Sequence, residues 1–202
     1  GYASESKRDG ILVAPYDAEL FGHWWFEGPL FLRQVLKRAC DSEQIELTTL
    51  SEDLDRRRQS QVVSLPEGSW GQGNHHYIWL NQHTEWTWSH IYEAEDRMVQ
   101  LARYWVDNPD RQNADLERVL KQAARELMLL SASDWQFLIS TFAARDYAEL
   151  RLSEHFEDFK RLAGIADKLI NEEPVGRGEW RYFESCAARD TLFEEIEIDW
   201  FA

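Results

Sequence analysis

The residues best suited to chemistry lie between Ala14 and Pro29, which read APYDAELFGHWWFEGP. In this stretch Asp17 follows the apolar run 11–14, which is long enough for a buried strand and too short for a helix. In barrels of parallel strands, catalytic groups lie just past the carboxyl ends of the strands, because the loops converge there. The pattern therefore predicts a catalytic acid at Asp17, although composition alone fits a loop acid that caps a turn after Pro15 equally well.

Aromatic side chains surround this acid in the sequence. They are Tyr16, Phe21, Trp24, Trp25 and Phe26. Aromatic ring faces stack on sugars, and they lower the polarity around a carboxyl group, which favours its protonated form. The combination of one acid and several rings indicates carbohydrate chemistry.

Composition excludes several classes of partner. The chain has 202 residues, of which 22 are basic and 37 acidic, so its net charge of −15 repels phosphate backbones and anionic membranes. Nucleic acid and membranes are not expected as partners, because the sequence also has no long apolar run and no signal segment. The two cysteines, Cys40 and Cys186, are too few for a disulfide framework, which favours a reducing cytoplasm. The chain begins with Gly1 rather than Met, which suits a fragment of a longer protein and equally a chain whose start was removed by processing or with a tag.

The first third of the chain has the pattern of a strand, a helix and a second strand. The run 11–14 predicts the first strand, and Gly28-Pro29 predicts the start of a helix through Ala39, because proline suits the first helical position. Residues 45–50 predict the second strand. One such unit cannot bury both faces of its own sheet, so it needs the rest of a barrel.

After Gly73 the apolar residues recur at helical spacing. The predicted core faces of three helices are Ile91, Ala94, Met98, Leu101 and Trp105; Leu116, Leu120, Ala123, Leu127 and Leu130; and Leu152, Phe156, Phe159, Ala163 and Ala166. A capping box of Ser133 with Gln136 predicts a further helix between the last two. Short loops favour antiparallel packing, and residues 171–202 are expected to form an extended strap on the bundle.

The stretch YDAELFGHWWFEGP resembles the fourth sequence motif of glycoside hydrolase family 57, in the version found in its 1,4-alpha-glucan (glycogen) branching enzymes. Residues 67–95 and 129–151 resemble the helical domain that follows the barrel in that family. The resemblance implies a mainly α fold, in which a helical bundle follows the last strand-helix-strand part of an incomplete (β/α)7 barrel. It implies two domains, a barrel piece at 1–66 that carries the acid/base motif and a helical C-terminal domain with the strap at 67–202.

The resemblance also implies roles for single residues. Asp17 aligns with the general acid/base of the family, and Glu19 with a supporting residue. A retaining glycosidase holds its acid about 5 to 5.5 Å from a carboxylate nucleophile. In this family that nucleophile is a glutamate on an earlier barrel strand, and no part of this chain matches its motif. His23 and Trp25 are expected to contact the substrate, although His23 also fits a supporting hydrogen-bonded group.

In the helical domain, Trp70 and Trp79 fall on positions that resemble glucan-contacting tryptophans of the family. Trp70 lies in a glycine-flanked loop, where an exposed ring suits a polymer substrate. Ser133 and Asp134 resemble a pair that lines the active site. Their alternative interpretation is structural, because serine caps a helix and aspartate suits its first turn.

The implied function is that of the C-terminal part of an alpha-glucan-acting enzyme, in particular a branching enzyme that cleaves alpha-1,4 bonds and transfers the chain to a 6-hydroxyl. The expected partners are alpha-1,4-glucan (amylose or glycogen) and the missing N-terminal barrel portion, and no cofactor is implied. No metal is expected, since among the neighbouring histidines His83 and His90 are too far apart to chelate one ion. The alternatives are an alpha-amylase or 4-alpha-glucanotransferase of the same family, or a non-catalytic glucan-binding helical domain.

Overall fold

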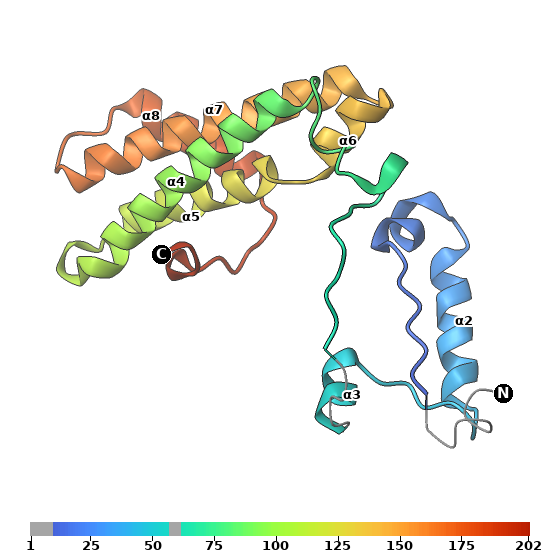
Figure 1. Ribbon diagram of the computed structural model, residues 1–202. Helices are drawn as coiled ribbons and strands as arrows, with labels where there is room; N and C mark the ends of the chain where they lie inside the picture. The colour runs from blue at the N-terminus through green and yellow to red at the C-terminus, as the bar shows by residue number, and fades with distance from the viewer. Residues whose placement is uncertain (1–9, 57–61) are drawn as a thin grey trace. The chain divides into compact units, whose positions relative to one another are not determined.

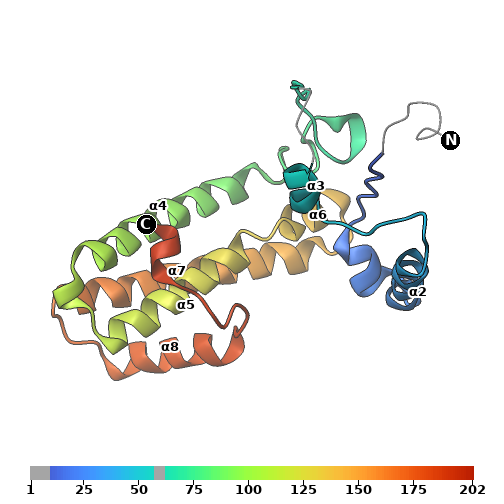
Figure 2. The same cartoon turned by 90° about the horizontal axis from the view of Figure 1, so that it is seen from below.

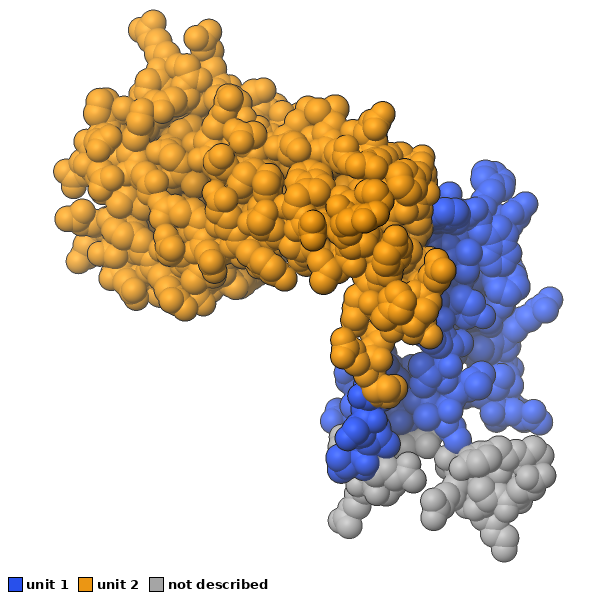
Figure 3. All heavy atoms as spheres, turned by 45° about the horizontal axis from the view of Figure 1, so that its top comes forward, with its two compact units in different colours: residues 1–65 blue, residues 66–202 orange. Residues whose placement is uncertain are grey.

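A computed structural model describes residues 10–56 and 62–202 (Figure 1). The chain forms two compact units, Gly1–Leu65 and Pro66–Ala202, which are coloured separately in Figure 3. The domain boundary predicted after residue 66 lies one residue from this division. The mainly α fold predicted from the sequence is confirmed, since every regular element of the described residues is helical.

The first unit contains a π-helical turn η1 (Leu20–Trp24) and two helices, α2 (Gly28–Cys40) and α3 (Leu50–Arg56). The predicted helix at Gly28-Pro29 is therefore confirmed as α2, with proline in its first turn. Gly28 is buried against the turn η1. A Cβ at this position would lie 3.2 Å from the Cα of Phe21 and 3.3 Å from the ring of Trp25, so a larger side chain would be crowded there. Glycine thus lets η1 pack directly against the start of α2.

The two strands predicted at 11–14 and 45–50 are absent from the described residues, and this part of the prediction is wrong for the chain by itself. Residues 11–14 have no regular structure, and Leu12 is 94% exposed. Leu50 begins α3 instead of ending a strand. A strand is defined by hydrogen bonds to a neighbouring strand, and the described residues offer none, so the apolar segments stay unpaired.

The second unit is a bundle of helices (Figures 1 and 2). Its helices are α4 (Glu85–Asp107), α5 (Ala114–Leu130), α6 (Asp134–Thr141), α7 (Arg145–Ile170) and α8 (Arg177–Arg189), with the short 3-10 turns η2 (Gln72–Asn74), η3 (Pro109–Arg111) and η4 (Ile198–Phe201). In both views α5 lies along α7, and α8 packs on the same group. The four helices predicted from apolar spacing and capping are confirmed as α4 to α7.

The core of this unit comes from the predicted apolar stripes. The fully buried side chains from α4, α5 and α7 include Ala94, Met98 and Leu101; Leu116, Leu120 and Ala123; and Leu152, Phe159 and Ala166. Helix α5 begins where Asn113 accepts a hydrogen bond from the amide of Leu116 at 2.9 Å, an N-cap that satisfies one free helix amide. No helix of the described residues is both long and apolar enough to span a membrane.

Two local predictions need correction. Ser133 precedes α6 but makes no capping bond with its side chain, and Gln136 is buried and points elsewhere. The tail is also not an extended strap throughout, because residues 177–189 form α8, which buries Phe183 and Cys186 three positions apart on one face. Only the terminal segment, residues 190–202, runs across the bundle with little regular structure, and it is anchored by buried Ile196 and Ile198.

Candidate functional site

Asp17 lies at the entry to the π-helical turn η1. Its side chain is exposed, and its carbonyl accepts a hydrogen bond from the amide of Leu20 at 3.2 Å. π-helical turns are rare in proteins and occur frequently at functional sites. The local fold therefore presents the predicted acid on an irregular turn, with its carboxylate free to meet groups from outside the described residues.

The aromatic residues beside Asp17 divide into two sets. Trp25 is half-buried, with its ring centroid 4.9 Å from that of Phe31 and 6.1 Å from that of Phe21, which in turn lies 5.8 Å from the ring of Tyr16. Trp24 is exposed and lies 6.1 Å from the ring of His23, which is also exposed. Thus Trp25 holds this turn against α2, whereas His23 and Trp24 face solvent.

A second aromatic group lies in the other unit, in the loop before α4 and on α6. Trp70 is 61% exposed, and its ring centroid lies 6.2 Å from that of Trp79 in an edge-to-face arrangement and 5.8 Å from that of Phe137. The structure thus brings together the two tryptophans singled out in the sequence. Phe137 was missed, because an aromatic residue within an apolar helix carries no signal that distinguishes it from core.

The loop that carries Trp70 is held in an unusual backbone conformation. Gly71 and Gly73 have φ angles of 101° and 74°, and the non-glycine residues Asn74 and His76 also adopt positive φ, at 54° and 67°. A Cβ at position 71 would lie 2.6 Å from Cγ1 of Ile78. Residues in such strained conformations cluster at functional sites, where the surrounding structure must hold them in place.

Hydrogen bonds join this loop to α4 and α6. The side-chain Nδ2 of Asn81 donates a hydrogen bond to Ser140 Oγ at 2.7 Å. Ser140 Oγ in turn donates to the backbone carbonyl of Ile78 at 2.5 Å. The Nε1 of Trp88 donates to the carbonyl of Trp79 at 2.9 Å. The polar residues that fix the tryptophan loop were not identified from the sequence, because their partners are distant in the chain.

Ser133 and Asp134 lie at the start of α6 and are both exposed. Asp134 precedes Phe137 by three residues, so the two share one side of the helix. The predicted polar pair therefore lies on the helix that supplies the third ring of the Trp70 group. Since Ser133 makes no capping bond, its hydroxyl is available for another contact.

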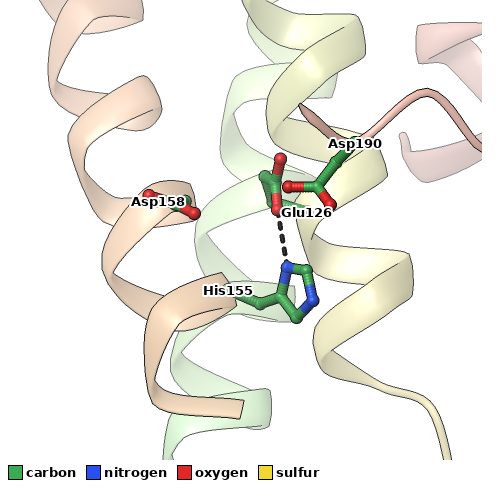
Figure 4. A group of neighbouring side chains, drawn as sticks. All are labelled: Glu126, His155, Asp158 and Asp190. Carbon is green, nitrogen blue, oxygen red and sulfur yellow. Dashed lines mark hydrogen bonds and ion pairs between the residues drawn. The ribbon is translucent and has the colours of Figure 1, made fainter. Parts of the chain in front are cut away.

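One buried group in the described residues has the composition of a metal site (Figure 4). Glu126, His155, Asp158 and Asp190 each offer a ligand atom, and these atoms lie within 4.8 Å of one another. Glu126 Oε2 lies 2.7 Å from Nδ1 of His155, and Arg151 approaches the other ring nitrogen at 3.1 Å. Because an arginine can only donate, Nε2 of His155 is the acceptor and Nδ1 carries the proton.

The remaining oxygens of this group also have partners. Asp158 accepts from the hydroxyl of Tyr182 and from Arg189, and Asp190 accepts from Nε of Arg189 at 2.8 Å. Burial, with the nearby Asp158 carboxylate, raises the pKa of the Cys186 thiol to about 12. A buried charge is strongly destabilising when it has no partner, and the pairing described here meets that requirement. We assign the group to an ion-pair network between α5, α7 and α8.

The four histidines that lie close together in the sequence, His75, His76, His83 and His90, have separate neighbours in the structure. His76 lies 3.5 Å from Glu67, and the rings of His75, His83 and His90 pack beside Tyr77, Phe142 and Phe156 respectively. Within the described ranges, the only grouping with metal-ligand composition is the one around His155.

Comparison with known proteins identifies the family. A family model described as 1,4-alpha-glucan branching enzyme, C-terminal, matches residues 90–201. The chain is 44% identical to a 1,4-alpha-glucan branching enzyme of Thermococcus kodakarensis over 190 residues, which are 94% of this chain and 27% of that protein. The chain is also similar to the crystal structure of a GH57-type branching enzyme from Pyrococcus horikoshii, with 41% sequence identity and a TM-score of 0.78. The match covers 99% of this chain and 36% of the Pyrococcus chain.

A more distant structural relative is the alpha-amylase AmyC from Thermotoga maritima, with 31% identity, a TM-score of 0.66, and coverage of 99% of this chain and 35% of its own. The chain spans about a third or less of the length of the relatives that it matches. The matched family model covers more than half of the chain, and the relatives agree with it. The chain therefore belongs to the GH57-type 1,4-alpha-glucan branching enzyme family, of which it spans the C-terminal part.

Proposed function

We propose that the chain is the C-terminal part of a branching enzyme that cuts alpha-1,4-glucan and transfers the cut chain to a 6-hydroxyl of another glucan. The observation that carries this proposal is the paired aromatic surface of Trp70 and Trp79, backed by Phe137, in a chain of this family. An exposed, strained loop has little structural reason to carry a tryptophan. Stacking on glucose rings provides one.

Asp17 is the general acid/base of the proposed reaction. In the first half it protonates the departing glycosidic oxygen while the glucan forms a covalent bond to a carboxylate nucleophile from the barrel portion outside this chain. In the second half it takes the proton from the attacking 6-hydroxyl of the acceptor. The exposed position of Asp17, three residues before the π-helical turn, supports this role, because the carboxylate is not engaged by its own unit.

The other candidate residues bind the substrate. His23, which faces solvent, and the exposed part of the Trp25 ring contact the substrate close to Asp17, and Ser133 and Asp134 offer polar contacts beside the aromatic surface on α6. Hydroxyl and carboxylate groups orient a sugar by hydrogen bonds, whereas the rings bind it without demanding one hydroxyl pattern.

The missing N-terminal barrel portion is the proposed partner of the first unit. Apolar side chains there are exposed, including Ile11, Leu12, Leu30, Phe31 and Val35, which is the pattern of a surface that another part of a protein covers. A cytoplasmic location is proposed on the two free cysteines, one of which is exposed.

The second candidate function is hydrolysis or 4-alpha-glucan transfer. The likeness to an alpha-amylase supports it. The three reactions share the cleavage step and differ in the group that attacks next, and the higher identity to branching enzymes favours branching.

One test uses the isolated chain with amylose. We expect no turnover by this chain, because the covalent step needs a nucleophile that it lacks. Reducing ends and iodine staining report hydrolysis and branching. Turnover that Asp17→Asn abolishes would contradict the proposal and would give Glu19 or another acid the nucleophile's role.

The aromatic surface is tested with maltoheptaose, whose affinity for the chain is measured by titration calorimetry. Trp70→Ala and Trp79→Ala should each cost about 1 kcal/mol of binding free energy and leave the melting temperature nearly unchanged. Trp105→Ala is the control, because this ring packs against the core and its loss should lower the melting temperature instead. If the first two variants melted like the third and bound normally, the glucan surface would lie elsewhere.

A further inference from the structure

Thr84 stands at the N-cap of α4, but its hydroxyl caps no helix amide. A threonine at this position ordinarily accepts a hydrogen bond from the amide two or three residues later. Here Thr84 Oγ1 instead accepts a hydrogen bond from the backbone amide of Asn81 at 3.0 Å. The same hydroxyl donates a hydrogen bond to the backbone carbonyl of Trp79 at 2.9 Å. The side chain is fully buried. The hydroxyl is therefore used to hold the loop and not to start the helix.

Further buried polar groups extend this contact to α6. Thr87 Oγ1 donates to the carbonyl of Thr84 at 2.6 Å, and Nε2 of Gln136 donates to Thr87 Oγ1 at 3.0 Å. All three side chains are buried. Burying polar groups is unfavourable unless each finds a partner, so a hydrogen-bonded chain of this kind specifies one geometry. It connects α6, through the first turn of α4, to the backbone of Trp79.

The two ends of this chain lie at the aromatic surface. Gln136 is adjacent to Phe137, whose ring lies against Trp70, and the other end holds the carbonyl of Trp79, whose ring also meets that of Trp70. We infer that Thr84 is a positioning residue that fixes the edge-to-face pair of Trp70 and Trp79 for stacking on a glucan, through its hydroxyl and not through contact with sugar. This inference rests on the proposed function for its glucan and on hydrogen-bond geometry for the pair itself.

The test compares Thr84→Val, which keeps the shape and removes the hydroxyl, with Thr84→Ser, which keeps the hydroxyl. In the unliganded 202-residue chain, nuclear Overhauser contacts between the indole protons of Trp70 and Trp79 should weaken in Thr84→Val and persist in Thr84→Ser. The affinity for maltoheptaose should fall about tenfold in the first variant and recover in the second. Ser153→Ala is the control, because the Ser153 hydroxyl donates to the carbonyl of Glu149 within α7 at 2.8 Å, and its loss should change neither readout.

Each other outcome overturns the inference. Wild-type ring contacts in Thr84→Val would show that the hydroxyl does not position the pair. A lower melting temperature with unchanged affinity, measured where all variants are folded, would reduce Thr84 to a stability role. If Thr84→Val does not fold, Thr84→Ala removes the same hydroxyl with a smaller side chain and gives the same comparison with Thr84→Ser.

Failure of the proposed function has a different signature. If Trp70→Ala and Trp79→Ala leave maltoheptaose binding unchanged, or wild-type chain binds none, the glucan surface is wrong. The ring contacts in Thr84→Val would still decide whether Thr84 positions the pair.

Discussion

Helices α2 and α5 have similar sequence patterns and opposite surroundings. Helix α5 buries Leu116 and Leu120 against α7, whereas in α2 Leu30 and Phe31 are exposed, at 63% and 51%. Among the described residues of the first unit, only Gly28 is buried. An amphipathic pattern thus shows that a helix has a face to cover, and it does not show whether the covering partner lies in the same chain.

Hydrogen exchange should show the largest difference between the two units. Amides of α2 should exchange at least about a thousandfold faster than the core amides of α5 and α7, because opening α2 exposes little additional apolar surface. Mass spectrometry of the exchanged chain gives both rates. Equal protection would mean that the first unit is self-contained or is covered in an oligomer, which a second measurement of the molecular mass in solution would distinguish.

The reactivity of the two cysteines also compares the two units, because one cysteine lies in each. Cys40 at the end of α2 is exposed, whereas Cys186 in α8 is buried and burial raises the pKa of its thiol to about 12. A thiol reagent at mildly alkaline pH should modify Cys40 at least about a hundredfold faster, since the thiolate is the reactive form. Both should react in denaturant, and Cys40→Ser should remove the fast phase. Rapid labelling of Cys186 in the native chain would place α8 among the loosely held elements.

A matched pair of leucines tests packing energy. Leu120 is fully buried in α5, and Leu30 is exposed in α2. Leu120→Ala should lower the free energy of unfolding by about 2 to 5 kcal/mol, through lost burial and the cavity left behind. Leu30→Ala should change it by no more than about 0.5 kcal/mol. Urea denaturation followed by circular dichroism measures both, and a large cost at Leu30 would mean that α2 is already covered.

The smallest effect is expected at the start of α8. The Lys168 ammonium, and then the backbone amide of Gly176, bond to the Glu179 carboxylate and lower its pKa below the ordinary value of a glutamate. A lowered pKa in the folded state contributes stability above the unfolded pKa, and this contribution is lost as the pH falls through the folded value. The melting temperature of Glu179→Gln should therefore lie slightly below that of wild type at neutral pH.

This gap in melting temperature should close as the pH falls through the lowered pKa of Glu179, where the carboxylate becomes protonated in the folded state. Glu173→Gln, in the connection before α8, is the control. A gap for Glu179→Gln that persists in acid would mean that the substitution acts through packing and not through charge.

The sequence predicted the parts of the fold that depend on local pattern. The stripes of α4, α5 and α7 repeat at helical spacing, and Gly28-Pro29 marks the start of α2. The strands at 11–14 and 45–50 failed because a strand needs a partner, and sequence alone does not say whether one is present. Helix α8 was missed because its glycine, its charges and its few apolar residues obscured the pattern.

Some residues of the candidate site were likewise identified from the sequence, and others were not. Trp70 and Trp79 were identified together, and the structure places their rings side by side, although their role stays a prediction. Thr84, Gln136 and Phe137 were not identified as members of the group. Gln136 and Phe137 matter through contacts with distant segments, for example between Gln136 and Thr87, and no local spacing records such a contact. Thr84 bonds to residues three and five positions away, and its place before a helix instead favoured an ordinary cap.

The left-handed backbone of the tryptophan loop has a consequence for sequence variation. Surface loops ordinarily accept substitutions more readily than cores do. Gly71, however, combines a φ of 101° with only 2.6 Å of space for a Cβ, and Gly73 has a φ of 74°. Saturation mutagenesis should return glycine at both positions, while buried Leu116 should tolerate an apolar side chain of similar volume such as methionine. In this loop, solvent exposure would be a poor guide to which residues are free to change.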